Sequence, residues 1–148
     1  MSNEKKVLVI VHPGSACGSA DFNLGKTART VRAALADEIT RWTGDFLVID
    51  GDLSDELPHY DIGRTLVRAL ADAEREGRHA HRTYACALQA GWPDKAADEF
   101  FKIWDPKVTK VLITGAWYQD DGHGCINAVQ RTLGGAVSAT ISERALRL

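Results

Sequence analysis

The feature that most constrains this sequence is an alternation of short apolar runs with segments of helical periodicity. The predicted strands lie at 6–11, 46–50, 82–88, 110–114 and 136–142; the first is a near-continuous β-branched run and the third is weaker. Between them, apolar side chains recur every three or four residues, as Val31, Leu35 and Ile39 do, which is the spacing of one face of an α-helix. The alternation predicts a parallel sheet with helices on both faces and right-handed crossovers.

Four helices are predicted between the five strands. They are a helix at 26–42, one beginning at Asp61, one beginning at Pro93, and one with Ile126, Val129 and Leu133 on one face. No helical pattern follows the fifth strand. The predicted fold is therefore a single α/β domain over 1–148, a three-layer, doubly wound parallel five-stranded sheet of flavodoxin-like type whose terminal helix is missing. Because a missing helix would leave apolar sheet surface exposed, a homo-oligomer is expected.

Composition and charge narrow the function classes. The chain has 148 residues, of which 45% are hydrophobic and 26% charged, and its net charge is −2. Neither a nucleic-acid partner nor an anionic membrane surface is indicated by this balance. No apolar run approaches the roughly 20 residues that span a bilayer, and the N-terminal segment passes directly into a strand pattern, so no signal peptide is expected. Three cysteines are an odd and sparse number, which favours a cytoplasmic, reducing location.

The loops that follow the first, third and fourth strands are the most unusual segments of the chain. In an open parallel sheet, ligands bind outside the carboxyl ends of the strands. The first loop is rich in small residues, the second carries Trp92, and the third carries Trp117 and Tyr118. These loops predict a small-molecule site at one end of the sheet. Each tryptophan either stacks on a planar ligand or covers the end of the core.

The first of these loops has the composition of an anion-binding loop. It contains Ser15, Ala16, Cys17, Gly18 and Ser19. Successive backbone N–H groups in such a loop, close to the start of a helix, can surround a phosphate. A plain turn that needs small residues explains the same composition, so both interpretations stay open.

Three segments resemble flavodoxins: "GSACGSAD" (14–21), "AGWPD" (90–94) and "KVLITGAWYQDDGHGCINAVQ" (110–130). The resemblance implies non-covalent binding of FMN, and a role in electron transfer or as a small flavin-dependent reductase. It implies that the phosphate lies among Ser15, Ala16, Cys17, Gly18 and Ser19. It also implies that Trp92 and either Trp117 or Tyr118 flank the ring, and that Asp120 or Asp121 disfavours the anionic reduced flavin by like-charge repulsion.

The segment 111–129 also resembles the isochorismatase-type cysteine hydrolases. That family places a nucleophilic cysteine at the start of a helix, after a strand that ends in glycine, and Cys125 occupies this place. A helix N-terminus lowers a thiol pKa, and His123 could assist. The family also has an aspartate at the end of strand one, where this chain has Val11-His12, and a lysine at strand three, for which the nearest candidate is Lys95. Cys125 as a buried structural residue is the alternative.

Two further hypotheses remain. His12, Cys17, His123 and Cys125 could converge, but their spacings are unusual for zinc, so no metal site is predicted. A doubly wound fold also supports many unrelated functions, and a non-catalytic binding or assembly module is the third functional alternative.

Overall fold

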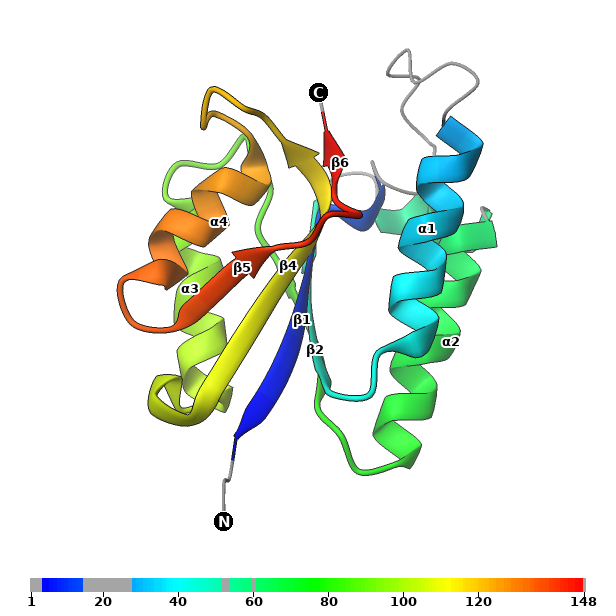
Figure 1. Ribbon diagram of the computed structural model, residues 1–148, viewed down its shortest axis with the longest axis horizontal. Coiled ribbons are helices and arrows are strands. Elements are labelled where there is room, and N and C mark those ends of the chain that lie inside the picture. The colour runs from blue at the N-terminus through cyan, green and yellow to red at the C-terminus, as the bar shows by residue number, and fades with distance from the viewer. Residues whose placement is uncertain (1–3, 15–27, 52–53, 60, 148) are drawn as a thin grey trace.

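The computed structural model describes residues 4–14, 28–51, 54–59 and 61–147. Strands and helices alternate along the chain as the sequence predicts (Figure 1). The elements are β1 (Lys5–Val11), α1 (Ala28–Arg41), β2 (Asp45–Asp50), η3 (Ser54–His59), α2 (Asp61–Arg75), β3 (Ala80–Tyr84), α3 (Trp92–Ile103), η4 (Pro106–Val108), β4 (Thr109–Tyr118), α4 (Cys125–Gly134), β5 (Ser138–Ile141) and β6 (Leu146–Arg147). The two η elements are short 3-10 helices.

The strands form one parallel sheet in the order β3-β2-β1-β4-β5, and the short β6 pairs with the end of β4. The predicted α/β class with a doubly wound sheet is confirmed. The order of strands in flavodoxins is 2-1-3-4-5, whereas here β1 lies between β2 and β4. The point at which the strand order reverses is therefore the crevice between β1 and β4, and ligand sites of this fold class form at such points.

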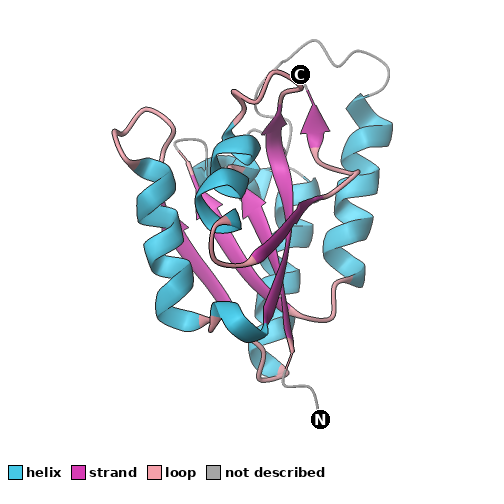
Figure 2. Ribbon diagram, turned by 60° about the vertical axis from the view of Figure 1, so that its left-hand side comes forward, coloured by secondary structure: helices cyan, strands magenta, loops and turns pink. Residues whose placement is uncertain are grey.

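Helices cover both faces of the sheet, with α1 and α2 on one side and α3 and α4 on the other (Figures 1 and 2). Successive strand residues point to opposite faces, so β1 contributes to two cores. Leu8 and Ile10 belong to the α1/α2 core, whereas Val7, Val9 and Val11 belong to the α3/α4 core. All five side chains are fully buried, as the near-continuous apolar run predicts for a central strand.

Two strand boundaries differ from the sequence-based expectation and change the carboxyl end of the sheet. The third strand ends at Tyr84, because the chain turns after Cys86, whose carbonyl accepts a hydrogen bond from the Gln89 N–H. The fourth strand continues to Tyr118. Trp117 and Tyr118 therefore lie on a strand, on opposite faces of the sheet, and not together in a loop.

The chain after β5 crosses towards the carboxyl end of the sheet instead of forming a helix; we call residues 142–147 the C-terminal strap. The strap ends as β6, in which Leu146 pairs with Ala116 and Arg147 pairs with Tyr118. On the face of β5 that a terminal helix would cover, Ser138 and Thr140 are exposed. The apolar surface from which an oligomer was expected is thus not found on β5, and a homo-oligomer stays a prediction.

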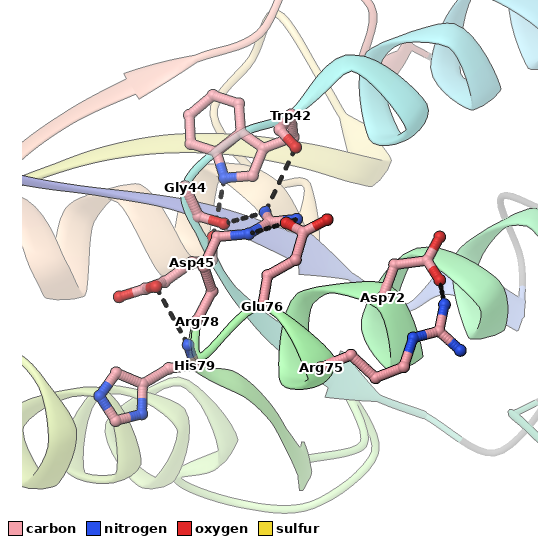
Figure 3. Close-up of polar contacts among 8 residues, drawn as sticks. All are labelled: Trp42, Gly44, Asp45, Asp72, Arg75, Glu76, Arg78 and His79. Atoms are coloured by element: carbon pink, nitrogen blue, oxygen red, sulfur yellow. Dashed lines mark hydrogen bonds and ion pairs between the residues drawn. The ribbon is translucent and has the colours of Figure 1, made fainter.

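At the opposite, amino end of the sheet, a buried carboxylate joins β2 to its surroundings. The Asp45 side chain accepts hydrogen bonds from the Trp104 indole N–H (2.8 Å) and from the His79 backbone N–H (3.1 Å). Arg78 donates hydrogen bonds to the carbonyls of Trp42 and Gly44, in the turn that follows α1 (Figure 3).

In the described ranges, no helix has both the length and the apolar character needed to cross a bilayer.

Candidate functional site

His12 is the first residue after β1 and lies at the centre of the carboxyl end of the sheet. Its backbone is in the left-handed region, with φ 48°, and only 8% of the residue is exposed. Its N–H donates to the Ile49 carbonyl, and its Nε2 lies 2.8 Å from the Ala85 carbonyl oxygen. Because a carbonyl oxygen can only accept, Nε2 donates this hydrogen bond and carries a proton.

Three other elements meet His12 at this end. Its ring lies 4.9 Å from the Trp92 ring, at the start of α3. A Cβ on Gly51, just after β2, would lie 3.1 Å from the His12 ring, so glycine allows β2 to end against it. With the Ala85 carbonyl, which lies just after β3, these contacts place the carboxyl ends of β1, β2 and β3 around the His12 ring.

β4 approaches β1 closely at the point where the strand order reverses. Val11 pairs with Gly115, and a Cβ on Gly115 would lie 2.2 Å from the Val11 carbonyl oxygen. Gly115 has φ 102°, which L-residues rarely adopt. After this pair the chain leaves β1 at His12, whereas β4 continues through Ala116 and Trp117 to Tyr118.

Cys125 is the first residue of α4, which starts directly beside the end of β4. A Cβ on Gly124 would lie 2.2 Å from the Trp117 carbonyl oxygen, so only glycine permits this approach. The Asn127 side chain accepts a hydrogen bond from the Gln119 N–H (3.0 Å) and fixes the connection. The half-buried Cys125 packs against the α3/α4 core, to which Trp92 and Ala85 also belong.

The electrostatic surroundings of Cys125 favour the neutral thiol. Burial is the largest influence and raises the pKa of Cys125 above its ordinary value, and the nearby Cys86 thiol raises it further. Hydrogen bonding by the backbone amides of Trp117 and of Cys125 itself lowers the pKa, but by less. The helix start therefore does not produce a net lowering of this pKa, because desolvation of the thiolate outweighs it.

Because the pKa of Cys125 is raised, the rate at which iodoacetamide alkylates Cys125 should still increase with pH above the ordinary thiol pKa. Only the thiolate reacts with iodoacetamide. The measurement is a pH–rate profile obtained by mass spectrometry of the peptide that contains Cys125. A profile that levels off near pH 7 would mean that the resting group is a thiolate, contrary to the expectation.

His123 is exposed and pairs with a carboxylate. Its side chain is 80% exposed, and its Nδ1 lies 3.3 Å from the Asp121 carboxylate, which also accepts the His123 N–H (3.0 Å). These contacts lower the pKa of Asp121. His123 is thus a partner of Asp121. That His123 assists Cys125 stays a prediction.

The residues expected to bind a flavin are only partly brought together. Ser15, Ala16, Cys17, Gly18 and Ser19 lie outside the described residues. Trp92 belongs to the α3/α4 core and Trp117 to the α1/α2 core, with 9% and 8% exposed, so the two indoles lie on opposite faces of the sheet. The Tyr118 ring is covered by the Arg147 guanidinium at 4.3 Å. Asp120 is exposed beyond β4.

Two features of this end were not identified as site components from the sequence. His12 was considered only as a metal ligand, although a polar residue directly after the most buried strand run marks the centre of such a sheet. No sequence pattern predicts Arg147 as a site residue, because its position depends on the path of the C-terminal strap. In the part of the chain that the structure describes, no group of three or more His, Cys, Asp or Glu side chains could hold a metal ion.

Comparisons with protein-family models, curated protein sequences and solved structures gave no match for this chain. The interpretation of the site therefore depends on its own geometry and chemistry.

Proposed function

We propose that the protein is a cysteine-dependent hydrolase of small ester or amide substrates, with Cys125 as the nucleophile. The observation that carries this proposal is the position of Cys125 as the first residue of α4, directly against the end of β4, where an added Cβ on Gly124 would lie 2.2 Å from the Trp117 carbonyl oxygen. Backbone amides at the start of a helix can stabilise the negative charge that develops on a carbonyl oxygen when the nucleophile attacks. β4 is also one of the two strands between which the strand order reverses.

In this proposal the thiol is protonated at rest, so a base must take its proton on attack. The sulfur adds to the substrate carbonyl carbon, and the oxyanion is stabilised by the backbone amides at the start of α4. Collapse of this intermediate expels the alcohol or amine, which takes up the proton from the base. Water then adds to the thioester carbonyl, the C–S bond breaks, and the carboxylic acid and the free Cys125 thiol are released. His12 is the proposed base because it stands at the strand end where the hydrolases that residues 111–129 resemble carry an aspartate.

The test is turnover of a panel of activated esters and anilides by wild-type protein and by Cys125→Ser. We expect Cys125→Ser to lower turnover at least about tenfold, because a hydroxyl is a much weaker nucleophile than a thiolate at neutral pH. Cys86→Ser is the matched control, since Cys86 is also a buried cysteine at this end, and it should keep most of the activity. Unchanged turnover in Cys125→Ser would overturn the proposal.

Binding of FMN, with electron transfer or flavin-dependent reduction, is the second hypothesis. It is supported by the doubly wound sheet and by the position of the crevice. It is favoured less than hydrolysis because Trp92 and Trp117 lie in different cores. Saturable binding in an FMN fluorescence titration, together with unaltered Cys125→Ser turnover, would place the flavin hypothesis first. A negative result in both assays would favour the non-catalytic module.

A cytoplasmic location also stays part of the proposal. Within the described residues, Cys86 and Cys125 form no disulfide, which agrees with a reducing compartment.

A further inference from the structure

The C-terminal strap brings a cation to the proposed site. The guanidinium of Arg147 lies over the Tyr118 ring at 4.3 Å from its centroid. Tyr118 lies between Trp117 and Gln119, and an added Cβ on Gly124 would lie 2.2 Å from the Trp117 carbonyl oxygen and 2.9 Å from the Gln119 nitrogen. Cys125 follows Gly124, and Tyr118 and Cys125 both pack against the α3/α4 core. Arg147 therefore reaches the edge of the crevice from the last strand of the chain, as the position of β6 beside the end of β4 shows (Figure 1).

The neighbouring cations at this end are engaged by other groups of the protein. Arg82 makes two hydrogen bonds of 2.9 Å to the Asp50 carboxylate, and Arg131 donates to the Gly122 carbonyl. Within the described ranges, no carboxylate lies within ion-pair distance of Arg147. A guanidinium that stacks on an aromatic ring keeps its N–H groups at its edge, where they can bind a carboxylate in a bidentate manner.

The strap is anchored firmly enough to give Arg147 a defined place. The Ser142 hydroxyl donates to the Glu38 carboxylate, and both residues are more than nine-tenths buried. The Ser142 N–H donates to the Ile113 carbonyl (2.8 Å), which continues the β4–β5 pairing. Leu146, next to Arg147, is fully buried in the α1/α2 core. Binding groups held in place before a ligand arrives lose less entropy on binding.

We infer that Arg147 is the specificity-determining residue of the Cys125 site and that the preferred substrates carry a carboxylate close to the ester or amide that is cleaved. This inference deepens the proposed function and rests on it for the reaction. The recognition of an anion beside Cys125 can be measured without any turnover. The role of Arg147 and the hydrolase reaction can therefore be tested separately.

The experiment compares alkylation of Cys125 by iodoacetate and by iodoacetamide, which are similar in size but differ in charge. The ratio of the two rates is followed by mass spectrometry of the peptide that contains Cys125, in wild type, Arg147→Gln, Arg147→Lys and Lys110→Gln. We expect Arg147→Gln to lower the iodoacetate/iodoacetamide ratio about two- to threefold at low salt, which corresponds to a unit charge at about 8 Å in water. Arg147→Lys should keep the wild-type ratio.

Lys110→Gln is the matched control because it removes the same charge from the same pair of neighbouring strands. Lys110 precedes Tyr118 by eight residues on β4, or about 26 Å, which is more than twice the screening length of about 10 Å at 0.1 M salt. The iodoacetate/iodoacetamide rate ratio of Lys110→Gln should equal that of wild type. In 1 M salt, the ratio of Arg147→Gln should also become equal to that of wild type.

An unchanged ratio in Arg147→Gln, or an equal fall in Lys110→Gln, would overturn the inference. If Arg147→Gln lowers the ratio while Cys125→Ser keeps full turnover, the anion site stands and the hydrolase proposal fails. If Cys125→Ser loses turnover and Arg147→Gln leaves the ratio unchanged, the hydrolase stands and the role of Arg147 is wrong.

Discussion

Replacing Gly115 with alanine should lower the free energy of unfolding by about 4 kcal/mol. Gly115 has φ 102°, and an added Cβ would lie 2.2 Å from the carbonyl oxygen and 2.7 Å from the nitrogen of Val11. Backbone strain of this kind costs about 1–3 kcal/mol by itself. The overlap adds to it because Val11 is fully buried and paired with strands on both sides, so neither backbone can move away without disturbing the sheet.

The measurement is urea-induced unfolding followed by tryptophan fluorescence. Gly134→Ala is the matched control, since Gly134 is the last residue of α4 and an added Cβ would meet nothing within 4 Å. Alanine is a better helix former than glycine by up to about 1 kcal/mol, so this variant should be as stable as wild type or slightly more stable. Wild-type stability in Gly115→Ala would show that β1 and β4 can separate at the crevice.

The sequence predicts the layers of this fold well, because the patterns that report them are local. The buried run of β1 and the helical spacing of Ile126, Val129 and Leu133 each reflect the immediate surroundings of one element. Strand order is different in kind. It depends on the direction of each crossover across the sheet, and no short stretch of sequence records that direction, so the placement of β1 between β2 and β4 required the structure.

The sequence places the candidate site at the carboxyl end of the sheet, and the strand boundaries change which of its residues come together. Trp117 and Tyr118 were expected together in a loop; because β4 includes both, their side chains take opposite faces. Ala85 and Cys86 were expected within a strand, but they follow it, and the Ala85 carbonyl holds the His12 ring instead. A shift of a few residues in a strand boundary thus decides which side chains meet at a crevice, and apolar periodicity is least informative at boundaries.

Replacing Asp45 with alanine should cost about 3–5 kcal/mol of stability. Asp45 is 5% exposed, and its carboxylate accepts the indole N–H of Trp104, itself 3% exposed, and the backbone N–H of His79. Truncation leaves the buried indole N–H without its acceptor, which costs about 1–3 kcal/mol, and removes the part-buried hydrogen bond from His79 to the carboxylate, which contributes about 1.5–3 kcal/mol. The same denaturation assay measures the loss. Asp105→Ala removes an exposed carboxylate that accepts only from the Lys107 N–H (3.0 Å) and should cost about 1 kcal/mol.

A double-mutant cycle decides whether the unpaired indole N–H causes the loss in Asp45→Ala. Trp104→Phe removes the donor, so Asp45→Ala in that background leaves one fewer buried group unsatisfied. We expect the double variant to be more stable than the sum of the two single losses predicts, by about 1–2 kcal/mol. Strictly additive losses would mean that the indole finds another partner in Asp45→Ala, and that Asp45 stabilises the start of β2 through His79 and packing alone.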